Sequence, residues 1–203
     1  MPARRHVTLI CSWTIVACLI AECTPAGAAA GSLDSSETSA HEEVRASPGP
    51  CRRASAAAAL PAFRIYISDA RVGSAAMQAL GLASARLATA ACRELLSEFT
   101  DGAGRPLADK LTGLRMSAEV YLRLIVIVDG SRLRPCLGTV TLAFTTPGSR
   151  VVYLCGTAFA TKLQQSPSEA THTIIHEFLH SLGLGENPPS SEDISRRIRQ
   201  LCW

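Results

Sequence analysis

One short segment, THTIIHEFLHSLGLGENPP at residues 171–189, constrains this chain more than any other. Its apolar residues recur every three or four positions, which predicts a helix with a buried face. His176 and His180 lie four positions apart, so their imidazoles project from the same face of that helix. Gly183 follows closely and suits the left-handed conformation in which many helices end. The chain must therefore fold around a short helix that presents two histidines and then turns sharply.

Two imidazoles one helical turn apart can bind the same metal ion. Zinc accepts histidine nitrogen at about 2.0–2.1 Å, and a catalytic zinc site has three protein ligands and one open position. Because a turn at Gly183 can return the chain toward the ion, Glu186 is the candidate third ligand. Glu177 is expected beside the ion, where it can take a proton from a zinc-bound water whose pKa is lowered toward about 7. The segment thus predicts a Zn²⁺ cofactor, Glu177 as the catalytic residue, and three metal ligands: His176, His180 and Glu186.

The string H-E-x-x-H-x-x-G-x-x-E at residues 176–186 resembles the zinc-binding signature of the zincin metallopeptidases. It is most similar to the metzincin branch, whose signature ends in His or Asp. The resemblance implies a zinc peptidase, a hydrolase that splits peptide bonds with glutamate-activated, zinc-bound water and acts on a peptide or protein substrate. It also implies an edge strand beside the active-site helix that pairs with extended substrate. The hairpin at 139–155 is the candidate for this strand.

The chain departs from the metzincin pattern in two respects. Its third-ligand position holds Glu186, and no methionine follows the motif, although metzincins carry a methionine turn beneath the metal. The methionines of the chain are Met1, Met77 and Met116. Other zincins take a glutamate ligand from a later helix, which leaves Glu192 or Asp193 as the alternative to Glu186.

Two residues near the motif have more than one possible role. His172 precedes His176 by one helical turn, so it extends the same ridge either as another metal ligand or as a polar neighbour of the site. Tyr153 lies in a strand-like run and either packs in the core or leans over the metal to stabilise an oxyanion. The sequence alone leaves both alternatives open.

The apolar pattern elsewhere predicts a sheet with helices packed on it. Alternating apolar residues predict strands, helical spacing predicts helices, and Thr-Pro-Gly-Ser predicts a hairpin turn. In chain order the predicted elements are a strand at 63–69, a long helix from Ala76 to Phe99, a loop at 101–119 with room for a helical turn, a buried strand at 120–130, a hairpin at 138–156, a helix from Ser166 to about Gly183, and a final helix capped by Ser190 or Ser191. This order favours the α+β class, with a zincin-like mixed sheet, a long helix, an active-site helix and a short C-terminal helix.

The N-terminus has the features of a secretory signal. Arg4 and Arg5 precede an apolar run at 7–21, which is shorter than the roughly twenty residues of a bilayer span. Small residues follow, with a candidate cleavage site after Ala30. We therefore predict a signal peptide at 1–30, a secreted or periplasmic protein, and no stable membrane span after cleavage. An uncleaved membrane anchor is the alternative.

Residues 31–60 are rich in Ser, Ala, Pro and Glu and lack an apolar period, which predicts a disordered linker. A zincin-like metallopeptidase domain is then expected at 61–203. The net charge is +3 and the arginines are scattered along the chain, so no nucleic-acid partner is expected. Two other functions fit the same motif: a zinc amide hydrolase that is not a peptidase, and a catalytically silent metal-binding or interaction domain.

Disulfide bonds are expected because an exported protein meets oxidising conditions. The chain has eight cysteines, of which five follow the predicted signal peptide. Cys136 and Cys155 flank the predicted hairpin and form the best pair, whereas Cys202 has two candidate partners, Cys92 and Cys51. Because the count is odd, at least one thiol is left over or bonds to another molecule.

Overall fold

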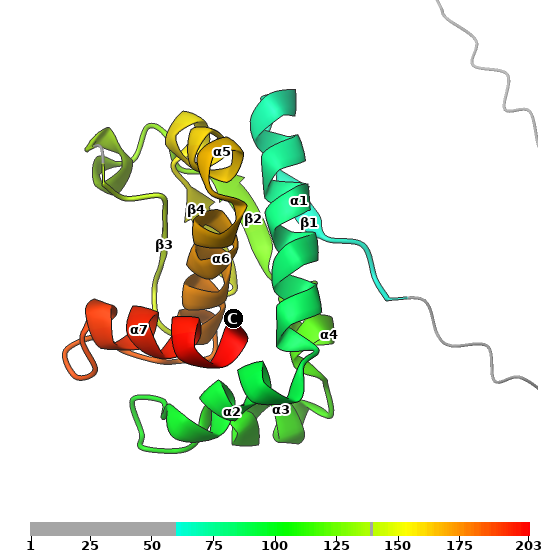
Figure 1. The fold of residues 1–203 in the computed structure, drawn as a ribbon, viewed down its shortest axis with the longest axis vertical. Coiled ribbons are helices and arrows are strands. Elements are labelled where there is room, and N and C mark those ends of the chain that lie inside the picture. Colours follow the sequence, from blue (N-terminus) through cyan, green and yellow to red (C-terminus); the bar gives the residue numbers. More distant parts are fainter. Residues whose placement is uncertain (1–59, 139) are drawn as a thin grey trace, which may run out of the picture. The chain divides into compact units, whose positions relative to one another are not determined.

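A four-stranded mixed sheet with helices packed on it forms the part of the chain that the computed structural model describes, residues 60–138 and 140–203 (Figure 1). The strands are β1 (Arg64–Tyr66), β2 (Val126–Asp129), β3 (Ala143–Thr145) and β4 (Val151–Leu154). Their order in the sheet is β1-β2-β4-β3, in which β1, β2 and β4 are parallel and β3 is antiparallel to β4. β3 is therefore an edge strand, and the predicted hairpin is confirmed.

Three helices pack against one another over the sheet: α1 (Ala70–Leu87), α5 (Gly156–Gln165) and α6 (Pro167–Ser181). The other helices gather toward the lower end of α1 and α6 in Figure 1, and they are α2 (Ala90–Glu98), α3 (Leu107–Leu114), α4 (Ala118–Leu122) and α7 (Ser191–Cys202). A 3₁₀ turn, η1 (Arg134–Leu137), lies between β2 and β3. This arrangement confirms the predicted α+β class.

The core lies between the sheet and the helices packed on it, above all α1 and α6. Ile127, Val152 and Leu154 point from the sheet into it and are almost fully buried. From Ala170 to Ser181, α6 is buried at every position except Thr173. A helix buried on nearly every side requires partners inside the protein for its polar side chains. His172 finds such a partner in α7 and His180 in the turn after α6, through hydrogen bonds to the carbonyl oxygens of Ser195 and Leu184.

The single long helix predicted from Ala76 to Phe99 is wrong, because the chain breaks between α1 and α2. Thr89 begins α2 as its N-cap, and its hydroxyl accepts a hydrogen bond from the backbone N–H of Cys92 (3.3 Å). The break rotates the apolar face, so Cys92 is buried where the continuous pattern had placed Ala91.

The segments predicted as a loop at 101–119 and a strand at 120–130 are also partly helical. α3 occupies part of the first, and α4 covers the start of the second, because Ser117 caps α4 and turns Tyr121 inward. The Tyr121 hydroxyl donates to the carbonyl oxygen of Ser181 at the end of α6 (3.0 Å). Only β2 at the end of the second segment is a strand. α5 lies where no helix was predicted.

Two disulfide bonds join described residues. The predicted pair Cys136–Cys155 is confirmed, and Cys202 pairs with Cys92, which links α7 to α2. Cys51, the predicted signal peptide and all of the predicted linker except Leu60 lie outside the described residues. Within the described ranges, no helix combines the length and apolar character that crossing a bilayer requires.

We predict that Cys92→Ser with Cys202→Ser lowers the free energy of unfolding by about 2–5 kcal/mol. The bond spans 110 residues, so its loss frees a long loop in the unfolded chain. The matched variant, Cys136→Ser with Cys155→Ser, removes a bond that spans 19 residues and should have a smaller effect. Urea unfolding of both variants measures the difference, and equal stability of all three proteins would contradict the prediction.

Candidate metal centre

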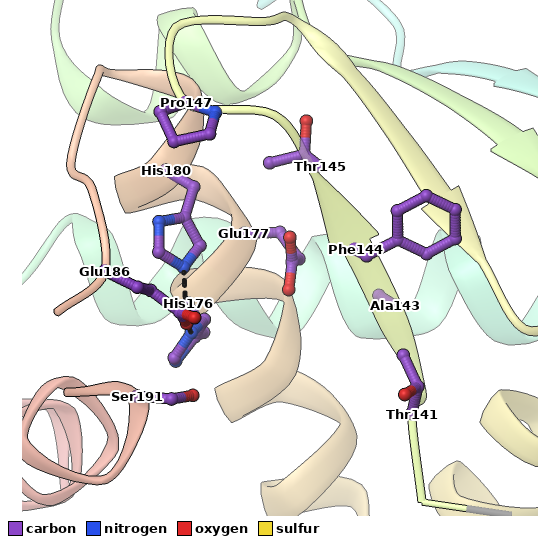
Figure 2. A pocket seen from close by; sticks show the side chains of 10 residues that line it. All are labelled: Thr141, Ala143, Phe144, Thr145, Pro147, His176, Glu177, His180, Glu186 and Ser191. Atoms are coloured by element: carbon purple, nitrogen blue, oxygen red, sulfur yellow. Dashed lines mark ion pairs between the residues drawn. The ribbon is translucent and has the colours of Figure 1, made fainter. Parts of the chain in front are cut away.

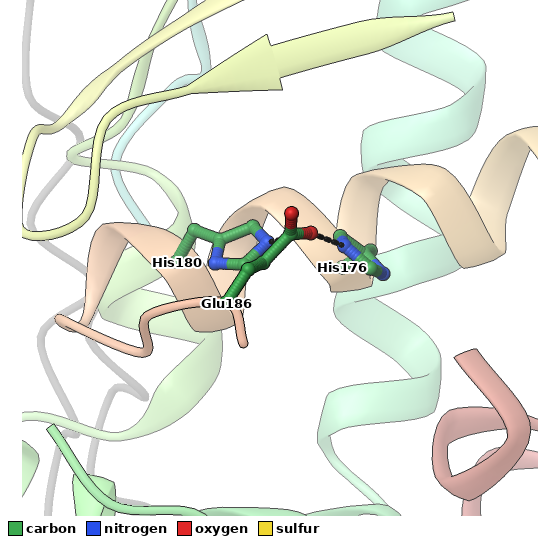
Figure 3. A group of neighbouring side chains, drawn as sticks. All are labelled: His176, His180 and Glu186. Atoms are coloured by element: carbon green, nitrogen blue, oxygen red, sulfur yellow. Dashed lines mark ion pairs between the residues drawn. The ribbon is translucent and has the colours of Figure 1, made fainter. Parts of the chain in front are cut away.

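Three side chains from the C-terminal half of α6 and the turn that follows it converge on one point (Figure 3). Nε2 of His176 lies 3.5 Å from Oε1 of Glu186, and Nε2 of His180 lies 3.3 Å from the same oxygen. One ligand atom from each residue lies within 4.8 Å of the other two. Both histidines are buried, whereas Glu186 is exposed. This group has the composition and spacing to hold a metal ion.

The separations of the three ligand atoms and the hydrogen bond of His180 also fit a metal ion. Ligand atoms at about 2.0–2.1 Å from a tetrahedral ion lie about 3.3 Å apart, close to the two observed separations. Nδ1 of His180 lies 2.8 Å from the carbonyl oxygen of Leu184, which can only accept, so Nδ1 carries the proton. In the neutral imidazole that a metal ligand requires, the lone pair is then on Nε2, which faces the Glu186 carboxylate. Electron-pair donors that converge in this way are satisfied by a cation.

His176 is neutral, which is the form that binds metal. Burial and the neighbouring His180 lower the pKa of His176 to about 4, although Glu186 offsets part of this change. Its Nδ1 also lies 3.4 Å from Oγ of Ser195 on α7. Because metal ligands must be deprotonated, His176 can bind an ion at neutral pH without first losing a proton.

The turn at Gly183 delivers the third member of the group. α6 ends at Ser181, and Gly183 has a φ of 110°, a conformation that favours glycine. Its backbone N–H donates to the carbonyl oxygen of His180 (2.8 Å). A Cβ at this position would lie 3.1 Å from Cβ of Asp101. Glycine therefore permits both the turn and the close contact that return Glu186 to the histidines.

Glu177 lies beside the three residues, on the side of α6 that faces β3 (Figure 2). It is 6% exposed, and its Oε2 has no hydrogen-bond partner among the described residues. Burial and the charge of Glu186 raise the pKa of Glu177 to about 8, while the backbone N–H of Thr145 offsets part of the rise. Glu177 is thus a buried carboxyl group that changes protonation near neutral pH, a property typical of general bases.

A cleft of about 390 Å³ lies between β3 and the turn after α6, and it is lined by His176, Glu177, His180 and Glu186. β3 forms one wall, and Glu186 and Ser191 form the other (Figure 2). The ring of Phe144 points away from the metal group in this view. The N–H of Gly148, in the turn between β3 and β4, donates to the carbonyl oxygen of His180 (2.8 Å). This bond fixes the distance between the edge strand and α6.

The alternative third ligands lie outside the group, which contains Glu186 and neither Glu192 nor Asp193. Asp193 instead accepts hydrogen bonds from the Ser190 hydroxyl (2.6 Å) and from the Arg196 guanidinium at the start of α7. The structure thus brings the expected carboxylate to the two histidines and engages Asp193 in capping a helix.

His172 and Tyr153 do not join the metal group. Nε2 of His172 donates to the carbonyl oxygen of Ser195 (3.2 Å), which ties α6 to α7. Tyr153 stacks on Phe144, with ring centroids 5.0 Å apart. Ser195, which contacts both His172 and His176, was missed by the sequence reasoning. No local pattern signals it, because its contacts arise only when α7 packs against α6.

The four site residues predicted from the sequence line one cleft: His176, Glu177, His180 and Glu186. Comparisons with protein-family models, with curated proteins and with solved structures found no match to this chain. The geometry supports a metal ion with a buried carboxyl group beside it.

We predict that Gly183→Ala weakens metal binding and lowers the free energy of unfolding by about 1–3 kcal/mol, because alanine is strained at this φ. Its Cβ would also press on Asp101 and displace the turn that carries Glu186. Gly185→Ala is the matched control, since a Cβ there meets nothing within 4 Å. Chelator competition and urea unfolding give the two readouts, and equal behaviour of the two variants would refute this role for Gly183.

We also predict that metal binding releases a proton from Glu177. With its pKa raised to about 8, this group is protonated near pH 6.5 in the metal-free protein, and a nearby cation favours the carboxylate. Calorimetric titration with Zn²⁺ in buffers of different ionisation enthalpy should therefore show about one proton more for the wild type than for Glu177→Gln. The difference should fall toward zero above about pH 9, where Glu177 is already ionised. A constant difference across this range would contradict the assignment.

Proposed function

We propose that this chain is a zincin-like, zinc-dependent peptidase. The observation that carries the proposal is the convergence of His176, His180 and Glu186 on one point, with the buried carboxyl group of Glu177 beside them. Two imidazoles and one carboxylate form a ligand set that zinc favours, and one position remains open to water or substrate. When bound, zinc polarises a carbonyl group and lowers the pKa of a water molecule toward neutral.

Glu177 has the position and surroundings of a general base. Glu177 lines the cleft, where its carboxyl group can take a proton from the attacking water. As the new C–O bond forms and the peptide C–N bond breaks, the same carboxyl group can pass that proton to the leaving amine. Burial keeps competing water away from the carboxyl group and strengthens its electrostatic effect.

The edge strand favours a peptide over a small amide as the substrate. β3 pairs on one side with β4 only, and its other side forms a wall of the cleft. An extended peptide can add to such an edge through main-chain hydrogen bonds, which would place one of its peptide bonds beside the metal position. The ring of Phe144 turns away from the metal group, so it leaves this wall accessible (Figure 2).

The disulfide bonds support export to an oxidising compartment. Cys92–Cys202 and Cys136–Cys155 both join segments of the catalytic unit, and such bonds persist in secreted or periplasmic proteins. This location agrees with the signal peptide predicted from the N-terminal sequence.

We predict that Glu177→Gln lowers the rate of peptide hydrolysis by about 10²–10⁴-fold and leaves zinc content unchanged, because it removes a base but no ligand. Hydrolysis is followed on a mixed peptide library, and zinc is measured by atomic emission. Full activity in Glu177→Gln would sink the proposed mechanism.

Two carboxylate variants serve as controls for the ligand set. Glu186→Ala should lose both zinc and hydrolysis, whereas Glu192→Ala should keep both. Stoichiometric zinc in wild type without cleavage of any peptide would instead support the silent metal-binding domain.

A further inference from the structure

A second hollow continues the metal cleft along α6 toward its N-terminal half. It has a volume of about 310 Å³ and is bounded by the segment before β3, by α6 and by α7. The two hollows share Thr141, Ala143, Ser191 and the metal-site residues His176 and Glu177. They therefore form one groove, and the second hollow lies where the chain of a bound peptide would continue.

The lining of this hollow carries almost no charge. Apart from Glu177, which belongs to the metal centre, no acidic or basic side chain other than histidine lines it. Besides the imidazoles of His172 and His176, its polar groups are the hydroxyls of four residues: Thr141, Thr173, Ser191 and Ser195. A charged substrate side chain would lose hydration there without gaining an opposite charge, which is unfavourable.

The hydroxyls of Ser195 and Thr173 each take part in one contact and can still form a further hydrogen bond. Zinc bound to Nε2 of His176 would leave the imidazole proton on Nδ1, which faces Oγ of Ser195 (3.4 Å), so the serine O–H would be free to donate. The Thr173 hydroxyl donates to the carbonyl oxygen of Glu169 (3.0 Å), so its oxygen remains free to accept. Ser195 and Thr173 thus offer one donor and one acceptor to the hollow. An aliphatic side chain would leave both without a partner.

We infer that this hollow is a substrate subsite for an uncharged side chain that forms hydrogen bonds, a carboxamide or a hydroxyl, and that Thr173 determines this specificity. The inference rests on the proposed peptidase function, since it assigns the side-chain preference of the same groove. Thr173 is suited to this role because it is the one residue between Ala170 and Ser181 of α6 that is not buried. The hydrogen bond from His172 to Ser195 holds the α7 wall against α6 (3.2 Å).

The test measures peptide binding without turnover. Zinc-loaded Glu177→Gln is titrated with acetylated and amidated hexapeptides of Gly and Ala that carry one varied residue, Gln, Leu, Lys or Glu, moved through all positions. At one position the Gln peptide should bind about fivefold or more tightly than the other three, the effect of a satisfied hydrogen bond. Equal binding of all four peptides at every position, or no binding of any, overturns the inference.

Substitutions at Thr173 locate the preference in the second hollow. In the Glu177→Gln background, Thr173→Val removes the acceptor and should abolish the preference for Gln. Thr173→Glu adds a carboxylate and should favour the Lys peptide by about tenfold. Ser168→Glu is the matched control, because it adds the same charge to α6 at an exposed position that does not line the groove. An unchanged preference in both Thr173 variants contradicts the assignment.

The binding results separate this inference from the proposed function. A Gln preference that depends on Thr173, together with an absence of cleavage by wild type, would support the subsite and refute the peptidase. Cleavage by wild type without any such preference would support the peptidase and refute the subsite.

Discussion

The hydrogen bond from Nδ1 of His180 to the carbonyl oxygen of Leu184 connects the end of α6 to the metal centre. It orients the imidazole so that Nε2 faces Glu186, and it holds the first residues of the turn that carries Glu186. Gly183 makes this turn possible through its left-handed conformation. The way in which α6 ends therefore sets the positions of His180 and Glu186, and a change in this turn would move both side chains.

The metal centre brings together groups that are unfavourable neighbours without a cation. Glu177 is buried near Glu186, and its pKa rises because its charged form is poorly solvated there. The pKa of His176 falls for the matching reason, since burial disfavours its protonated form. A divalent ion would favour the ionised form of Glu177 and would bind the neutral form of His176, so it suits both side chains. Binding of such an ion would also stabilise the folded chain over the unfolded one.

The sequence predicts best those features that depend on local spacing. The position of His176 and His180 on one helical face, the turn at Gly183 and the hairpin all follow from residues close together in the chain. The break at Thr89 was missed because an apolar stripe continues across it, and only the cap distinguishes two helices from one. The contacts of Ser195 could not be predicted, since they depend on how α7 packs against α6.

The bond from the Gly148 N–H to the carbonyl oxygen of His180 has a consequence for what the groove can admit. It joins the tip of the hairpin to α6, so the gap between the edge strand and the metal position cannot widen freely. In the proposed peptidase, substrate pairs with β3 as an extended strand, so a substrate helix must unwind before it can pair. Tightly folded proteins would then resist digestion, and loose tails or unstructured loops would be cut first.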